Sequence, residues 1–195
     1  MILWTIQPED VYELINRTGV YRCDGRKKGM RYYREQYLWL ADQMRRRIGP
    51  PPEGVRYPVW AWQRWDKDRL KPDLRAIRWF WGGKSNTFCR LEIEIPDEQI
   101  LLSDFEGWAW NVLNRWLICY TEHECDEMEM LYASLTPEGQ KFMLEKNRER
   151  IFNIEPFDNG FARRGEIVQA TFWELRLDQI RKVTRFASTR RKEDI

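Results

Sequence analysis

The segment FCRLEIEIP, residues 88–96, constrains the fold more than any other stretch of the sequence. Its apolar residues Leu91, Ile93 and Ile95 alternate with two glutamates. Because successive side chains of a β-strand point to opposite faces, this alternation predicts a strand with one buried face and one face in water. Such a strand needs neighbouring strands and a covering layer, so the chain must contain a sheet packed against something else.

Other segments predict the partners of this strand. Apolar alternation or short apolar runs indicate further strands at residues 2–6, 20–24, 55–65, near 101–104 and from 167 to about 176, the last followed by a final turn and a tail. Helical spacing of apolar residues, with start and stop signals, predicts helices over residues 8–18, 33–48, 105–120 and 137–150. In the first helix, Pro8 occupies the first turn and Gly19 provides the left-handed stop.

The order of these elements predicts the fold class. Strands precede, separate and follow the helices without regular strand–helix–strand alternation, which favours an α+β domain over a doubly wound one. A length of 195 residues with 43% hydrophobic composition fits one domain with one core. We therefore expect a single α+β domain over residues 1–195, with a mixed, mainly antiparallel sheet flanked by helices and a helical insertion at about residues 105–150.

Charge and cysteine usage restrict the environment. The formal net charge is +2, so binding to nucleic acid or to an anionic membrane surface must come from local patches. No basic leader and no membrane-spanning segment is apparent, and the four cysteines show no paired spacing. We expect a cytoplasmic protein with reduced thiols and no membrane association.

Tryptophan is the most unusual component. Eleven occur in the chain, and five of them lie in one stretch: Trp60, Trp62, Trp65, Trp79 and Trp81. Such rings stack on nucleotide bases, yet they also fill protein cores with the ring nitrogen bonded to a carbonyl. The sequence leaves both roles open, and we expect one or two of these rings to line a cleft.

Two weaker patterns concern metals and nucleic acids. On a helix, Cys119 and His123 share one face, but two ligands do not make a site, so we expect no metal. Basic segments at residues 25–34, 44–49 and 188–194 would suit phosphate contacts, with Tyr32 and Tyr33 available for stacking. Arginine at a helix C-terminus is also ordinary capping, so nucleic-acid binding stays one alternative.

The segment IVQATFWELRLDQIRKV, residues 167–183, places Gln169 and Glu174 among aromatic residues. In a regular strand these two side chains face opposite ways, so both line one cleft only if the strand bulges between them. A carboxylate in apolar surroundings is typical of functional groups. The alternative is that Glu174 pairs with Arg176 on a solvated face.

Four separated segments in order suggest a family. LWTIQPEDVYELINRTGVYRCD, IGPPPEGVRYPVWAWQRW, LEIEIPDEQILLSDF and QATFWELRLDQIRKV together resemble an uncharacterised bacterial family of domains of unknown function that extends over the full length of such chains. This resemblance implies no activity.

A second resemblance is at the level of architecture. A first strand, a helix ending in glycine, a short strand and a late strand with glutamate are similar to ADP-ribosyltransferase-like domains, with Thr5 at that family's histidine position and Gln7 at its threonine position. The resemblance implies NAD as cofactor and Glu174 as the catalytic carboxylate that stabilises the oxocarbenium-like cation as nicotinamide leaves. The cofactor-binding residues it implies are Thr5, Gln7, Tyr57, Trp60, Trp62 and Gln169.

Two functions therefore remain. One is an NAD-dependent ADP-ribosyltransferase-like enzyme that binds NAD or a related nucleotide in an aromatic-lined cleft. The other is a non-catalytic module in which the same cleft recognises a nucleotide, nucleic acid or a protein partner. The absent histidine in the first strand favours the module, whereas convergence of Glu174 on Thr5 would favour the enzyme.

Overall fold

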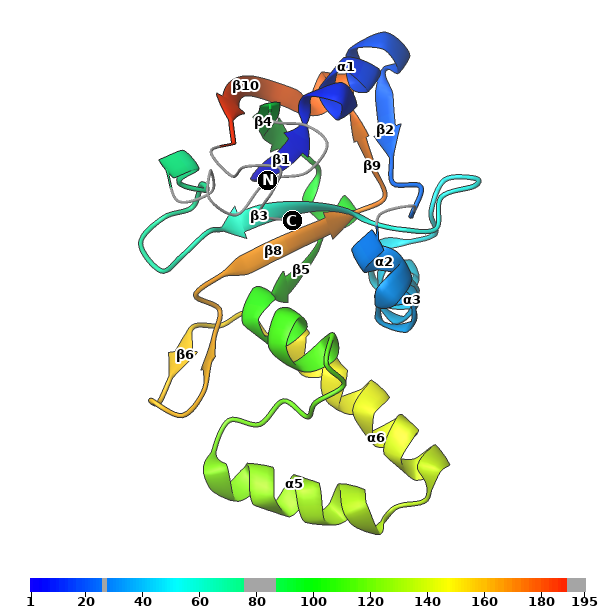
Figure 1. Cartoon of the computed structure of the whole chain (residues 1–195), viewed down its shortest axis with the longest axis vertical. Coiled ribbons are helices and arrows are strands. Elements are labelled where there is room, and N and C mark those ends of the chain that lie inside the picture. Colours follow the sequence, from blue (N-terminus) through cyan, green and yellow to red (C-terminus); the bar gives the residue numbers. More distant parts are fainter. Residues whose placement is uncertain (26–27, 76–86, 189–195) are drawn as a thin grey trace. The chain divides into compact units, whose positions relative to one another are not determined.

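The computed structural model describes residues 1–25, 28–75 and 87–188 (Figure 1). The chain forms two compact units, the first from Met1–Leu101 and Ala170–Ile195 and the second from Leu102–Gln169. The second unit contains the segment for which a helical insertion is predicted, about residues 105–150. The chain passes between the units within two strands, β5 (Leu101–Asp104) and β8 (Val168–Phe172).

The sheet confirms the predicted α+β class. Six strands follow the order β10-β4-β1-β3-β8-β5, and a separate two-stranded sheet pairs β2 with β9. The remaining elements of the first unit are, in chain order, β1 (Ile2–Pro8), α1 (Glu9–Thr18), β2 (Val20–Arg22), α2 (Lys28–Tyr32), α3 (Arg34–Ile48), β3 (Val59–Arg64), β4 (Thr87–Glu94), η1 (Asp97–Gln99), β9 (Glu174–Arg176), η4 (Leu177–Gln179) and β10 (Ile180–Ala187). The pairs of β1 with β3 and β4, of β4 with β10, and of β2 with β9 are all antiparallel.

The first helix begins and ends where its sequence predicts. Pro8 lies immediately before α1, and Glu9 and Asp10 lie in its first turn, where carboxylates are favoured by the helix dipole. Gly19 ends the helix at a φ of 79° and donates its N–H to the carbonyl of Ile15 at 2.8 Å. Glycine adopts this left-handed conformation without the steric penalty of a side chain, so the chain turns directly into β2.

The two faces of the sheet carry different residues. On one face Leu3 lies opposite Ile93 and Thr5 opposite Leu91, and α1 packs against β1 and β4. On the other face the buried residues Ile6, Phe88 and Phe186 form a second cluster with the half-buried Trp65 and Leu74. The alternation predicted for residues 88–96 is therefore confirmed, although that strand's second face is only partly in water.

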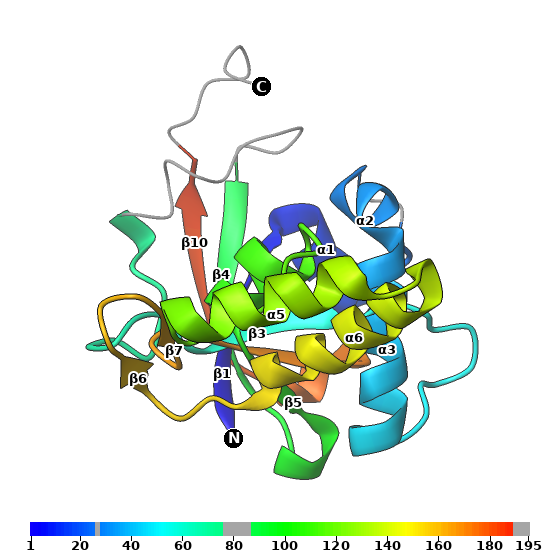
Figure 2. The ribbon, with the colours of Figure 1, turned by 90° about the horizontal axis from the view of Figure 1, so that it is seen from below.

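The second unit contains mostly helices. Its elements beyond β5 and β8 are the π-helical turn η2 (Gly107–Val112), α5 (Glu122–Ser134), α6 (Pro137–Arg148), η3 (Glu149–Phe152) and the hairpin strands β6 (Phe157–Asp158) and β7 (Arg163–Arg164). Thr121 and Thr136 cap α5 and α6 by accepting backbone N–H groups three residues ahead. The two helices pack against each other (Figure 2).

The structure differs from the sequence expectations over residues 105–120 and after residue 176. The helix predicted over residues 105–120 ends near Val112, because Arg115 adopts a φ of 62° and the Asn111 side chain donates to the Leu117 carbonyl at 2.7 Å, which fixes the following segment outside the helix. The chain after residue 176 is also not a final turn and tail. After η4 it forms the eight-residue strand β10, which extends the sheet beyond β4.

None of the helices among residues 1–25, 28–75 and 87–188 combines the length and apolar character needed to span a bilayer.

Candidate functional site

Thr5 and Gln7 are buried in β1 and bonded to each other. The Thr5 hydroxyl donates to the Trp60 carbonyl at 2.7 Å and accepts from Gln7 Nε2 at 2.8 Å. Only 1% of Thr5 and 5% of Gln7 is exposed. Gln7 Oε1 has no hydrogen-bond partner among the described residues, which leaves one buried acceptor in this strand for a ligand or water.

The aromatic residues predicted to line a cleft lie in three settings. Trp60 is half-buried and contacts the ring of Tyr37 edge-on, with centroids 6.1 Å apart. Trp62 lies opposite Trp4 across the β1–β3 pair. The ring of Tyr57 covers Gly25 so closely that a Cβ there would lie 2.2 Å from a ring carbon, which explains why a glycine with a φ of 70° occupies that position. Of the predicted tryptophan cluster, Trp79 and Trp81 lie outside the described residues.

Glu174 is fixed by an arginine that the sequence analysis did not pair with it. In the β2–β9 sheet Arg22 lies opposite Glu174, and its Nε and Nη2 atoms both approach Oε2 of the carboxylate at 2.9 Å. The other oxygen, Oε1, has no hydrogen-bond partner within the described parts of the chain. The predicted alternative partner, Arg176, instead pairs with Asp178.

The strand that carries Gln169 and Glu174 is interrupted. Residues 168–172 form β8 and residues 174–176 form β9, with Trp173 between them donating its Nε1–H to the Gly49 carbonyl at 3.0 Å. The regular alternation on which the opposite-face argument depended therefore ends at Trp173. Gln169 is buried, and its Nε2 has no hydrogen-bond partner in the described residues.

The first unit also contains a cavity that the sequence analysis did not anticipate. Its volume is about 590 Å³, and Trp4 from β1 and Arg90 from β4 lie at its wall together with the segment that follows β3. The lining residues are Trp4, Arg69, Leu70, Lys71, Pro72, Asp73, Leu74, Arg75 and Arg90. A cavity of this size suits a small organic ligand.

Hydrogen bonds hold the cavity wall in place. Arg90 Nη1 donates to the Pro72 carbonyl at 2.7 Å, which ties the loop to the sheet. Asp73 accepts from the side chains of Arg69 and Arg75 and from the Arg75 backbone N–H. These bonds, with Arg75 contributing most, hold the pKa of Asp73 below its usual range. The loop that forms this wall is therefore basic and held in place by hydrogen bonds. Its one carboxylate among the lining residues, Asp73, is already paired with arginine.

Trp4 is the aromatic component of this cavity. Its Nε1–H donates to Glu92 Oε2 at 3.3 Å, and Trp4 also lies opposite Glu92 in the register of β1 and β4. Lys182 of β10 lies opposite Glu92 on its other side. An indole held at one edge, beside four basic side chains, combines a stacking surface with positive charge. The sequence contains the alternation of Trp4 with Leu3 and Thr5 and a separate basic segment at residues 69–75, but nothing in it indicates that the two meet.

The predicted nucleic-acid patches are only partly described. At the end of α3, Arg46 forms an ion pair with Asp42, and Arg47 donates to Gln43 at 3.3 Å, so both contact their own helix. Residues 26–27 of the first patch and 189–195 of the tail lie outside the described residues.

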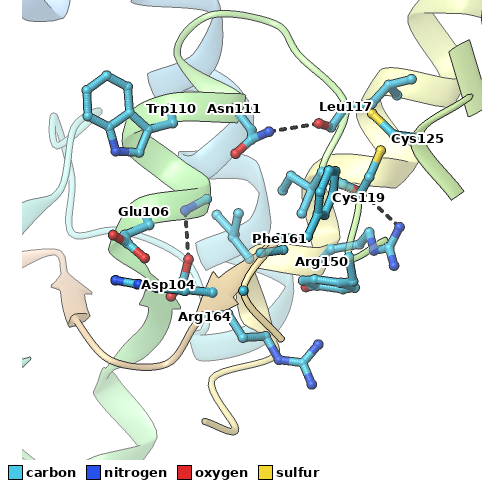
Figure 3. Close-up of a pocket in the computed structure, with 17 residues that line it drawn as sticks. Asp104, Glu106, Trp110, Asn111, Leu117, Cys119, Cys125, Arg150, Phe161 and Arg164 are labelled. Atoms are coloured by element: carbon cyan, nitrogen blue, oxygen red, sulfur yellow. Dashed lines mark hydrogen bonds between the residues drawn. The ribbon is translucent and has the colours of Figure 1, made fainter. Parts of the chain in front are cut away.

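The second unit has its own cavity of about 480 Å³ (Figure 3). Asp104 lies at its base and accepts from the backbone N–H groups of Gly107 at 2.6 Å and Gly165 at 2.7 Å. Burial raises the pKa of Asp104, although the two backbone donors oppose that shift. Glu106 lies beside it, and desolvation followed by repulsion from Asp104 and Glu166 raises the pKa of Glu106.

The opposite wall of this cavity carries both thiols of the second unit. Cys119 and Cys125 line it, with Arg150 close by (Figure 3). Arg150 Nη1 donates to the Ile118 carbonyl at 2.8 Å and lies 2.8 Å from Glu124 Oε1. His123, the predicted companion of Cys119, is exposed and lies 3.5 Å from Glu127. Among the residues the structure describes, no three His, Cys, Asp or Glu side chains gather closely enough to hold a metal ion.

Fold and cavities together define an α+β protein with one basic, aromatic cavity in its sheet unit and one mixed polar cavity in its helical unit. The chain belongs to the family described as Domain of unknown function (DUF3841), whose model matches residues 2–181. No curated protein and no solved structure matches the chain.

Proposed function

We propose that the first unit is a nucleotide-binding module whose ligand occupies the cavity of Trp4, Lys71, Arg75 and Arg90. The observation that carries this proposal is the position of an indole within one basic cavity. A nucleotide presents a flat base and an anionic phosphate group. Stacking on an aromatic side chain contributes roughly 1–3 kcal/mol per base, and cationic side chains attract phosphate.

The individual residues have separate roles in this proposal. Trp4 supports the base, and its bond to Glu92 fixes the plane of the indole. Arg90 uses one N–H to hold the Pro72 carbonyl, which leaves other guanidinium donors for phosphate oxygens. Lys71 is exposed and has no ion-pair partner among the described residues. Its ammonium group is therefore available to bind a phosphate. NAD and adenine nucleotides are the ligands to test first.

Calorimetry on the purified full-length protein tests this directly. We expect saturable binding of NAD or ADP, a Kd roughly tenfold or more higher in Trp4→Leu, and weaker, less salt-dependent binding in Lys71→Met. Matched controls are Trp110→Leu and Lys141→Met, which change an exposed tryptophan and an exposed lysine of the second unit. The proposal is wrong if nothing binds at millimolar ligand, or if Trp4→Leu and Lys71→Met bind as the wild type does.

A second candidate is NAD-dependent ADP-ribosyl transfer with Glu174 as the electrostatic stabiliser. The observation that favours it is the fixed carboxylate, in which Arg22 holds Oε2 while Oε1 has no protein partner in the described residues. An oxygen of that kind suits a ribose hydroxyl or a developing positive charge. Gln7, to which the resemblance also assigns a ribose contact, lies in β1 of the six-stranded sheet, whereas Glu174 lies in β9 of the separate two-stranded sheet.

Release of nicotinamide from NAD distinguishes the two functions. Transfer chemistry predicts release by the wild type and its loss in Glu174→Gln, with NAD affinity largely kept. Glu94→Gln is the matched control, because Glu94 is also a strand carboxylate of the first unit that pairs with an arginine, Arg181, at 2.9 Å. Binding without any release supports the module, and equal release by Glu174→Gln and wild type argues against the catalytic role of Glu174.

A further inference from the structure

Three sulfur atoms gather around the start of α5 in the second unit. Cys119 precedes the helix, whereas Cys125 and Met128 belong to it and, three residues apart, share one of its faces. We propose that Cys119 Sγ, Cys125 Sγ and Met128 Sδ form a three-coordinate site for a soft monovalent cation, Cu⁺. The site is independent of the nucleotide cavity.

The spacing of the sulfurs fits such an ion. Cys119 Sγ lies 3.9 Å from Met128 Sδ, and the sulfurs of Cys119 and Cys125 lie next to each other (Figure 3). A metal–sulfur bond of about 2.3 Å, as in zinc thiolates, with angles of about 120° places two sulfurs about 4 Å apart. The distance between the sulfurs of Cys119 and Met128 is therefore already that of a trigonal complex.

Local hydrogen bonds preorganise this arrangement. Asn147 accepts from the Ile118 N–H at 2.6 Å and donates to the Ile118 carbonyl at 3.1 Å, and Glu124 accepts from the Tyr120 N–H at 2.6 Å. The residues on both sides of Cys119 are thus held by side chains, and the Thr121 cap fixes the start of α5. The ligand geometry does not depend on a free loop.

The donor set selects a soft ion. Thiolate and thioether ligands favour Cu⁺, whereas a structural zinc ion needs four ligands, and the exposed His123 is turned to Glu127. Binding breaks the two S–H bonds, forms three copper–sulfur bonds and releases two protons, and nothing is oxidised or reduced. Burial, followed by the hydrogen bond with Cys125, raises the pKa of Cys119 to about 12, so the metal must displace protons from thiols that are otherwise neutral.

Some of the charged groups around the three sulfurs stabilise the proposed Cu⁺ complex, and others destabilise it. Two thiolates and Cu⁺ carry one net negative charge, which Arg150 and the N-terminus of α5 stabilise. Against this, Glu129 Oε1 lies 3.8 Å from Cys125 Sγ, and Glu124 is also near. Asn147 Nδ2 and Arg150 Nη1 lie 3.6 and 3.9 Å from Met128 Sδ, so they orient the thioether and use part of its acceptor capacity.

Anaerobic titration of the reduced full-length protein with Cu⁺, in competition with a chromogenic Cu⁺ chelator, tests the site. We expect one tightly bound equivalent that Cys119→Ser and Cys125→Ser abolish. Loss of a residue that only supports a metal ligand lowers metal affinity roughly tenfold to hundredfold. Met128 is a proposed ligand itself, so we expect Met128→Leu to lower Cu⁺ affinity by at least that factor. Met130→Leu, an exposed methionine of the same helix, and Cys89→Ser, a buried thiol of the first unit, are the controls and keep full affinity.

A second measurement uses the wild type alone and avoids folding defects of the variants. One equivalent of Cu⁺ slows alkylation of Cys119 and Cys125, located by mass spectrometry, and leaves Cys23 and Cys89 unchanged. The proposal is overturned if the cysteine variants bind Cu⁺ as the wild type does, if protection falls on other thiols, or if Cu⁺ treatment gives a Cys119–Cys125 disulfide without bound metal.

Discussion

The two units are held together in different ways. In the first unit the core is apolar, and most of the largest fully buried side chains come from its sheet and helices: Leu3, Ile15, Leu40, Met44, Leu91, Ile93, Ile95, Phe172 and Leu175. In the second unit only Val112 and Ile151 belong to that group. Two of the buried polar side chains of the second unit, Asp104 and Asn147, bond the backbone of segments 61 and 29 residues away along the chain.

This difference predicts where single substitutions act. Loss of one methyl group in the sheet core removes part of a large buried area, whereas loss of one buried polar anchor in the second unit leaves backbone groups without partners. The thiol-lined cavity also lies in the second unit, and side-chain hydrogen bonds hold the residues on both sides of Cys119 there. The following substitutions test that contrast.

Asp104→Ala has the largest expected effect. The substitution leaves the N–H groups of Gly107 and Gly165 without their acceptor, so we expect a loss of about 3 kcal/mol of unfolding free energy. Urea unfolding followed by circular dichroism measures it, with Asp126→Ala, an exposed carboxylate of α5, as the control. Amide exchange at Gly107 and Gly165 is expected to accelerate. If both variants unfold at the same urea concentration, Asp104 is not an anchor.

The anchors illustrate what the sequence could not predict. Periodicity predicted β1, α1, α3, β3 and β4, because these elements bury one regular face. The end of the helix near Val112 depends on Asn111 bonding Leu117 and on the positive φ of Arg115, neither of which leaves a periodic signal. The strand β10 was missed because its pairing with β4 is a long-range contact and its pattern is mixed.

The candidate sites were predictable to different degrees. The aromatic face of β3 was expected, but the cavity beside it requires Arg90 and the loop from Arg69 to Arg75 to meet Trp4, which only tertiary structure brings about. The sulfur cluster was only partly predictable, since the sequence analysis paired Cys119 with His123 and not with Met128, whose sulfur lies 3.9 Å from that of Cys119. Glu174 was chosen as a candidate because it is a carboxylate within apolar sequence, but its partner Arg22 lies 152 residues away along the chain, so no local pattern indicates the pair.

Thr5→Val tests a buried polar anchor of the first unit, as Asp104→Ala does in the second, and the expected loss of unfolding free energy is smaller. Valine keeps the shape but removes the bonds to the Trp60 carbonyl and to Gln7, so we expect a loss of about 1–2 kcal/mol. Thr184→Val on β10 is the control. If Thr5 is purely structural, the folded variant binds nucleotide with unchanged affinity. A fall in affinity without a fall in stability would instead make Thr5 a ligand contact.

Glu106→Gln is expected to stabilise the second unit by about 0.5–1 kcal/mol at neutral pH, a figure reduced because the carboxylate is partly in water. The folded state raises the pKa of Glu106 above its unfolded value, so the ionised form is disfavoured on folding. That penalty is complete above the folded pKa and disappears as the pH falls through it toward the unfolded value. Urea unfolding at neutral pH and at about pH 4 measures the difference between the variants. A gain that persists unchanged in acid would contradict this electrostatic cause.

The Arg22–Glu174 pair is expected to contribute least, about 0.3–0.5 kcal/mol, because Arg22 is 49% exposed and water screens the interaction. A double-mutant cycle with Arg22→Met and Glu174→Gln, at low and high salt, measures the coupling, which is expected to shrink as salt is added. A small coupling means that Glu174→Gln stays folded, so any loss of nicotinamide release in that variant reports on chemistry. A coupling above about 2 kcal/mol, insensitive to salt, would instead make the pair a structural anchor and would require Arg22→Met as a control in every activity assay.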